Sequence, residues 1–165
     1  IPTIKNFIGR NKVKEFTVVA DAAMISSENI THLNQNEINY IVGARLGNLS
    51  IKILGTIDEQ IVRQDGKSIR IKTELGYLIC SYSSVRYRKD LYEMNKQIEK
   101  AKQVVEVPSK SRKLKFTKTN DQKLELNEEL IEKTKKLLGI KGYYTSLEEN
   151  IADNKTIIER YHELY

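Results

Sequence analysis

The chain has 165 residues, of which 39% are hydrophobic and 30% are charged, proportions that are typical of a globular protein with a modest core. No apolar run approaches the roughly 20 residues that span a bilayer, and the single cysteine, Cys80, excludes an internal disulfide, which fits a reducing cytosol. The first residues, Ile1-Pro2-Thr3, lack a signal peptide's basic and apolar segments and an initiator methionine, so we expect a piece of a longer protein.

Positive charge is unevenly distributed along the chain. The net charge is +6, and residues 84–120 alone hold eleven Lys or Arg against four Asp or Glu. A local excess of this size favours a polyanionic partner such as a nucleic acid. The alternative is a solvated helix face followed by a basic loop, which is what many runs of charge turn out to be.

The first strong element is an apolar run over residues 16–20, which follows a short predicted helix at 2–12. A short apolar run bounded by polar residues predicts a buried strand of an α/β sheet, and this strand ends at Asp21. Ligands collect at the carboxyl ends of strands in such sheets, so Asp21 is a candidate site residue. Asp is also common in turns and at helix N-caps, and the spacing alone leaves both interpretations open.

A helix over 27–36 and a strand over 38–44 are predicted next. Strand, helix and strand at this length indicate a βαβ unit, whose two strands lie parallel in one sheet. That arrangement places Asp21 and Arg45 at the same edge. Arg45 would there either hold a phosphate or pair with a surface carboxylate.

The middle of the chain predicts a helix capped by Ser50, with Ile51, Leu54 and Ile61 on one face. Alternation on both sides of Gly76 then predicts a hairpin, in which Arg70 faces outward.

A long helix follows, from Ser83 or Ser84 to about Glu106. Its apolar stripe has spacings of three and four residues and consists of Leu91, Met94, Ile98, Ala101 and Val105.

The last third predicts a basic strand over 112–119, a turn, and a partner strand over 123–126. A helix then runs from Asn127 to Leu138. The final predicted helix begins near Asp153 or Asn154 and runs to the end of the chain. One face of it carries Ile157, Ile158, Tyr161 and Leu164.

Two stretches, VVADAAMISS at residues 18–27 and YIVGAR at 40–45, resemble the segment around the second aspartate of bacterial insertion-sequence transposases of the DDE type. The resemblance implies that Asp21 is a metal ligand. It also implies the fold class, a mixed α/β protein with a partial ribonuclease H-like core, an inserted β-containing lobe and a long helix. The core would comprise residues 1–45 and 143–165, and the insertion lobe would comprise 46–142.

Further motifs support the same resemblance. The phrase Ser81-Tyr82-Ser83-x-x-Arg86 resembles part of the insertion lobe, and Gly142-Tyr143-Tyr144-Thr145-Ser146 resembles the stretch before the catalytic helix. Tyr161 matches the first residue of the Tyr-x2-Arg-x3-Glu-x6-Lys motif, whereas Leu164 stands where the Arg is usual. The motif's Glu would fall beyond Tyr165 and the first Asp before Ile1, so this stretch would carry one of three metal-binding acids.

The function implied by the resemblance is DNA cutting and joining by two-metal phosphoryl transfer, with Mg²⁺ or Mn²⁺ in the full-length parent. The fragment itself would be inactive and would hold no metal stably. The implied partners are double-stranded transposon ends and a second copy of the parent, in the bacterial cytoplasm at the nucleoid and away from membranes. The alternative is a non-catalytic nucleic-acid-binding module that uses the basic 84–120 region. The candidate DNA contacts are Arg45, Arg86, Arg88, Lys89, Arg112, Lys113, Lys115 and Tyr161.

Overall fold

The computed structural model describes residues 2–11, 15–107 and 114–165 and has a mixed α/β fold, which confirms the predicted class. The chain divides into two compact units. We call the first the sheet unit, and it consists of Ile1–Asn48, Lys67–Ser81 and Lys141–Tyr165. We call the second the helical unit, and it consists of Leu49–Gly66 and Tyr82–Ile140.

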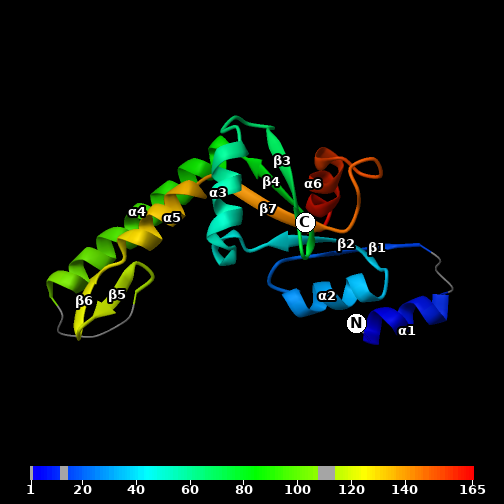
Figure 1. Cartoon of the computed structure of the whole chain (residues 1–165), viewed down its shortest axis with the longest axis horizontal. Coiled ribbons are helices and arrows are strands. Elements are labelled where there is room, and N and C mark those ends of the chain that lie inside the picture. Colours follow the sequence, from blue (N-terminus) through cyan, green and yellow to red (C-terminus); the bar gives the residue numbers. More distant parts are fainter. Residues whose placement is uncertain (1, 12–14, 108–113) are drawn as a thin grey trace. The chain divides into compact units, whose positions relative to one another are not determined.

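The elements follow one another along the chain as labelled in Figure 1. The helices are α1 Pro2–Asn11, α2 Ser27–Gln35, the 3-10 turn η1 Leu46–Asn48, α3 Ile51–Gln60, α4 Ser84–Glu106, α5 Glu128–Lys136 and α6 Asn154–His162. The strands are β1 Thr17–Ala20, β2 Asn39–Ala44, β3 Ser68–Thr73, β4 Gly76–Tyr82, β5 Thr117–Asn120, β6 Lys123–Leu126 and β7 Ile140–Thr145.

The sheet unit is built on a five-stranded sheet with the strand order β1-β2-β7-β4-β3. Strands β1 and β2 are parallel, with Ala20 opposite Val42, so the predicted βαβ pairing is confirmed. Strand β2 is antiparallel to β7, and β3 is antiparallel to β4. The carboxyl ends of β1 and β2 therefore meet at one edge, which is where Asp21 follows β1.

Two features of this sheet differ from the sequence prediction. Strand β7 lies in the middle of the sheet, although no strand was predicted over residues 140–145. Tyr143 and Tyr144 favour a strand, but Gly139 directly before β7 and Gly142 within it are residues that usually interrupt one. Strand β1 is half-buried rather than buried, because it is the edge strand and only one neighbour covers it.

The predicted division into core and insertion also differs in one segment. The expected insertion limits, 46 and 142, lie near unit boundaries, but β3 and β4 belong to the sheet unit. The reason is that β4 hydrogen-bonds to β7, so the hairpin extends the same sheet as β1 and β2.

One face of the sheet carries the core that includes α6. Its buried residues come from three strands, from the loop after β7 and from the helix, and they are Ile41, Ile79, Tyr143, Leu147, Ala152, Ile157 and Tyr161. Cys80, next along β4, points to the opposite face and is completely buried.

Arg70 lies on the covered face of the sheet and not toward solvent as predicted. It pairs with Ile79 in the β3–β4 register, and Ile79 belongs to the core under α6. Its guanidinium donates to the carbonyls of Leu147 at 2.9 Å and Ala152 at 2.7 Å, and to Asn154 Oδ1 at 3.0 Å. These bonds satisfy backbone groups of the loop that leads into α6, so a charged side chain on an apparently alternating strand anchors the helix.

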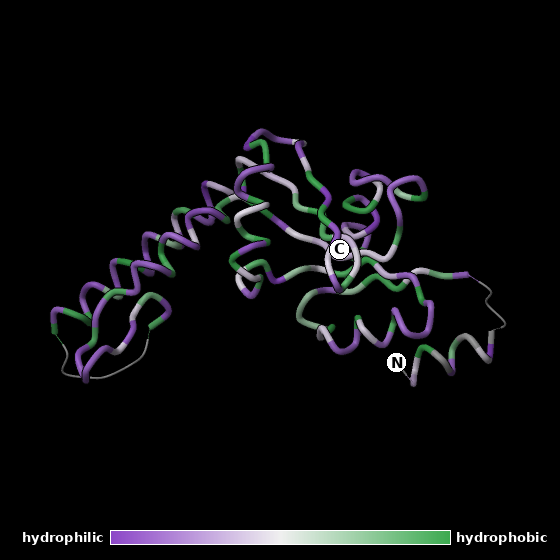
Figure 2. Tube along the Cα trace, in the orientation of Figure 1, coloured by the Kyte–Doolittle hydropathy of each residue, from purple (hydrophilic) through white to green (hydrophobic). Residues whose placement is uncertain are grey.

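The helical unit has its own core, formed where α4 contacts the β5–β6 hairpin and α5. Four of the five residues of the predicted stripe of α4 belong to this core or pack against it, namely Leu91, Met94, Ile98 and Ala101. Figure 2 shows apolar and polar residues alternating along the helix. The buried residues are Met94, Ala101, Phe116, Ile131 and Leu138. A hydrogen bond of 2.9 Å from Ser83 N to Gly139 O joins the two ends of the segment 83–139, which contains α4, the hairpin and α5.

Two predicted helix faces need correction at single residues. Helix α3 begins after the Ser50 cap as expected, and Leu54 and Ile61 are buried, but Ile51 is 81% exposed because it is the first residue of the helix. In the last helix, Tyr161 is buried, but α6 ends before Leu164, which is 43% exposed.

Candidate active site around Asp21

Asp21 sits in a tight turn directly after β1. Its backbone carbonyl accepts a hydrogen bond from Met24 N at 3.0 Å, and its side-chain Oδ1 accepts one from Ala23 N at 2.8 Å. This is an Asx-type turn, in which the short side chain replaces a backbone acceptor. The turn interpretation of Asp21 is thus correct, and it leaves the second carboxylate oxygen, Oδ2, available for another role.

Helix α6 and the residues directly after it supply the partners of that second oxygen. The Tyr161 hydroxyl donates to Asp21 Oδ2 at 3.1 Å, and the Tyr165 hydroxyl donates to the same atom. The helix is capped by Asp153, whose side chain accepts a hydrogen bond from Thr156 N at 2.8 Å. Residues that are 140 positions apart in the sequence thereby meet at one end of the sheet.

The surroundings of Asp21 favour its ionised form. The pKa of Asp21 is lowered by the hydrogen bonds from Tyr165, Ala23 N and Tyr161, and to a smaller extent by the positive charge of Lys141. Lys141 Nζ lies 4.5 Å from the centroid of the Tyr161 ring. Burial, together with these hydrogen bonds and the charge of Asp21, raises the pKa of Tyr161, so its hydroxyl stays protonated and keeps donating.

The fit of a metal ion to this site can be tested on its oxygen donors. Two-metal phosphoryl transfer needs several carboxylates within one coordination shell. No group of three or more His, Cys, Asp or Glu side chains that could hold a metal occurs within residues 2–11, 15–107 and 114–165. On α6, Glu159 lies 3.8 Å from Lys155, and Glu163 follows the helix. Asp21 and its described neighbours therefore do not form a Mg²⁺ site by themselves.

Cys80 is no alternative nucleophile. The thiol is completely buried in β4, and this burial raises its pKa to about 12. A thiol attacks as its thiolate, which is scarce at neutral pH when the pKa is this high.

The candidate DNA contacts are dispersed over both units. Arg45 is exposed just after β2, and Arg86 forms an ion pair of 3.3 Å with Asp90. Tyr161 is only 2% exposed, so its surface is mostly covered. The remaining candidates divide into Arg88, Lys89 and Lys115, which are exposed, and Arg112 and Lys113, which lie outside the described residues.

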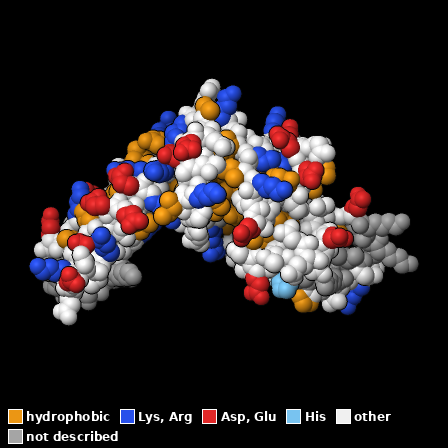
Figure 3. Space-filling model, viewed as in Figure 1, with side chains coloured by type: hydrophobic (Ala, Val, Ile, Leu, Met, Phe, Trp, Pro, Cys, Tyr) orange, Lys and Arg blue, Asp and Glu red, His pale blue; other side chains and the backbone are white. Residues whose placement is uncertain are grey.

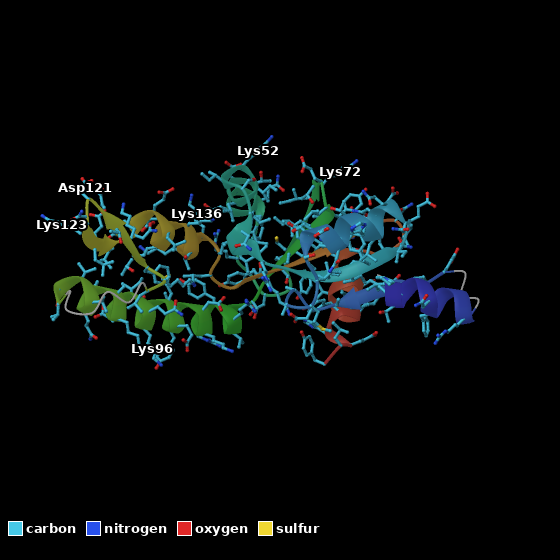
Figure 4. All side chains as sticks on the ribbon, turned by 90° about the horizontal axis from the view of Figure 1, so that it is seen from below. Lys52, Lys72, Lys96, Asp121, Lys123 and Lys136 are labelled. Atoms are coloured by element: carbon cyan, nitrogen blue, oxygen red, sulfur yellow. The ribbon has the colours of Figure 1, made fainter. Side chains whose placement is uncertain are left out.

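Most of the net charge belongs to the helical unit. It contains 17 Lys or Arg and 12 Asp or Glu, whereas the sheet unit contains 11 and 10. Figure 3 shows basic and acidic side chains intermixed over α4 and α5 on the visible face. In Figure 4, Lys96 extends from one side of this unit and Lys123 and Lys136 from the other. Among the labelled lysines, positive charge therefore lies on more than one side of this unit.

Sequence reasoning did not identify Gly43 and Lys141 as parts of the Asp21 site. Gly43 appeared only as a motif residue, and Lys141 had no role, because the strand β7 that carries it was not predicted. Gly43, Lys141 and Tyr161 lie on β2, β7 and α6, respectively. No spacing in the sequence predicts that these three elements come together at Asp21.

Among the described residues, no helix combines the length and the apolar character needed to cross a bilayer. Comparisons with known protein families, with curated proteins and with solved structures found no match for this chain. The resemblance to DDE transposases consequently rests on the residues quoted from the sequence.

Proposed function

We propose that this chain is part of a DDE transposase, in which Asp21 is one of the acids that hold the catalytic metal ions. One observation carries the proposal. Asp21 lies at the carboxyl end of β1, beside the parallel strand β2, and α6 brings Tyr161 directly to its carboxylate. A strand-end aspartate next to α6, which carries the Tyr161 of the resembled motif, supports the proposal.

In this proposal the described residues supply only part of the chemistry. Asp21 contributes one ionised carboxylate in a fixed orientation, and further acids of the parent protein complete the site. Mg²⁺ or Mn²⁺ supplies the charge stabilisation of phosphoryl transfer when it is bound. The partners are double-stranded transposon ends and a second copy of the parent, in the bacterial cytoplasm at the nucleoid.

The experiment replaces Asp21 by Asn in the longer protein. Asn keeps the acceptor for Ala23 N and favours the same turn, but it removes the negative charge that a metal ion needs. We expect Mg²⁺- or Mn²⁺-dependent DNA cleavage to fall below a few per cent of the wild-type rate, measured on a labelled transposon-end duplex. Thermal unfolding of the variant should match that of the wild type.

The matched control is Glu149→Gln, which also removes one carboxylate charge from an exposed position of the sheet unit. It should leave cleavage unchanged. If Asp21→Asn folds normally and still cleaves at more than a few per cent of the wild-type rate, Asp21 is a turn residue only and the proposal fails.

The second candidate function is a non-catalytic nucleic-acid-binding module. The observation that favours it is the excess of positive charge in the helical unit, with 17 basic against 12 acidic residues. Contacts to phosphates from such a surface carry no base information, so binding would be weak and without sequence preference. The salt dependence of binding tests it, as set out in the Discussion.

A further inference from the structure

The Tyr161 side chain is fixed in place from several directions. It is 2% exposed, and its ring packs edge-to-face on Tyr143 with centroids 4.9 Å apart and planes inclined at 71°. Lys141 Nζ lies 4.5 Å from the same ring. A buried tyrosine hydroxyl normally needs a hydrogen-bond partner, and here that partner is Asp21 Oδ2.

Gly43 provides the room for this hydroxyl. A Cβ atom at position 43 would lie 2.8 Å from Tyr161 Oη and 3.0 Å from Ala22 N. Both distances are too short for ordinary contacts, and the Ala22 atom is backbone and cannot turn aside. A side chain at position 43 would therefore force the Tyr161 hydroxyl or the Ala22 backbone to shift, and this crowding explains the glycine of the Tyr-Ile-Val-Gly-Ala-Arg stretch.

The two carboxylate oxygens of Asp21 therefore accept hydrogen bonds from different parts of the fold. Oδ1 is turned to Ala23 N in the turn, and Oδ2 is turned to Tyr161 on α6. Tyr165 reaches the same oxygen from an exposed position, whereas Tyr161 is buried and closely packed. Tyr161 is therefore the partner that can impose one orientation on the carboxylate.

We infer that Tyr161 is a positioning residue, which orients the Asp21 carboxylate through its hydroxyl, and that Gly43 makes this contact possible. The part of the inference that concerns cleavage rests on the proposed function. The inference assigns Tyr161 a role different from the DNA contact that the sequence resemblance implies. Its small exposed area and its bond to Asp21 both favour the positioning role.

The first test measures the orientation of Asp21 in this 165-residue chain without reference to activity. Three-bond couplings to the Asp21 side-chain carbon, measured by NMR near neutral pH, give the rotamer populations about χ1. We expect one rotamer in the wild type and averaging over rotamers in Tyr161→Phe, which keeps the ring and its packing on Tyr143. Gly43→Ala should show the same averaging. The control Gly47→Ala, where an added Cβ meets no atom within 4 Å, should retain the wild-type couplings.

The second test uses cleavage by the longer protein. A positioning role predicts that Tyr161→Phe lowers kcat roughly 10- to 100-fold, because a displaced catalytic group loses much of its effect. KM for DNA should stay unchanged. A phosphate-contacting tyrosine would instead raise KM, and that result would overturn the inference.

The two proposals fail in different ways. A single Asp21 rotamer in Tyr161→Phe overturns the positioning role, whatever Asp21→Asn does to cleavage. Averaged rotamers together with full cleavage by Asp21→Asn would support the positioning role and remove the transposase function. If Gly43→Ala does not fold, the Tyr161→Phe couplings still decide the question.

Discussion

The two units use their polar side chains in different ways. In the sheet unit, hydrogen bonds join distant parts of the sequence: Tyr161 reaches Asp21 across 140 positions, and Arg70 reaches two carbonyls 77 and 82 positions away. In the helical unit, ion pairs along the helices are local, such as Lys102 with Glu99 at i,i+3, although Arg63 also donates to the carbonyl of Lys136, 73 positions away. Long-range bonds fix geometry, whereas local surface pairs contribute little to stability and leave the charges near solvent.

This difference separates two kinds of function. A reaction that depends on oriented groups belongs where the polar atoms are fixed by the fold, and the candidate site of the sheet unit meets that condition. Contact with a polyanion needs exposed charge more than fixed geometry. The helical unit provides the exposed charge, with five more basic than acidic residues, against one more in the sheet unit.

The largest expected effect comes from removing the centre of the helical core. Phe116 is completely buried between α4 and the hairpin, so Phe116→Ala should lower the free energy of unfolding of this unit by about 3–5 kcal/mol. Hydrogen exchange read by NMR should show lost protection in α4 and α5. The sheet unit should keep its protection, since it has a separate core.

The control for this variant is Val85→Ala on α4, because Val85 is 67% exposed. It should change stability by no more than about 0.5 kcal/mol. Equal loss of protection in both units after Phe116→Ala would mean that they unfold as one, and the comparison between them would lose its energetic basis.

A somewhat smaller effect is expected from Arg70→Ala in the sheet unit. The substitution leaves the carbonyls of Leu147 and Ala152 without their charged donor, and this should cost about 2–4 kcal/mol in urea unfolding. Lys72→Ala is the matched control, since Lys72 lies on the same strand but is exposed. If Arg70→Ala and Lys72→Ala lower the free energy of unfolding by the same amount, the long-range bonds of Arg70 do not stabilise the sheet unit.

The smallest expected change concerns the salt dependence of DNA binding. Replacement of Arg88, Lys89 and Lys115 by Ala should reduce the slope of log affinity against log salt by about 2 to 3, if each contacts a phosphate. A titration with a short duplex at several salt concentrations measures this slope.

The matched control removes the same number of charges from the sheet unit, at Lys67, Lys72 and Lys155. This control should leave the slope as it is in the wild type. Equal slopes for the helical-unit variant and the wild type would show that the exposed charge there does not contact DNA, and the binding-module alternative would lose its support.

Local patterns in the sequence predicted local structure well. The apolar spacing of α4, the cap at Ser50 and the turn at Gly76 correspond to the observed elements, because each depends on residues that are neighbours in the sequence. The parallel pairing of β1 with β2 followed from the length of the connection.

What the sequence did not reveal depends on contacts between distant segments. Strand β7 was not predicted because its neighbours in the sheet, β2 and β4, determine its place more than its own propensity does. Arg70 fits an outward position by alternation, and only the loop before α6 explains why it is covered. For the site, the position of Asp21 after a strand was foreseen, but its contact with Tyr161 could not be.

The separation between Asp21 and Tyr161 also determines when the site comes into being during protein synthesis. Translation delivers Asp21 140 residues before its partner Tyr161 on α6, and Tyr40 105 residues before Thr145, to which it bonds in the sheet. In the sequence, the residues of the helical unit fall almost entirely between β2 and β7. The hydrogen bond from Ser83 N to Gly139 O within that unit shortens the loop that β2 and β7 must close. A nascent chain interrupted between the Asp21 turn and α6 would therefore contain the aspartate but not the tyrosine that orients its carboxylate.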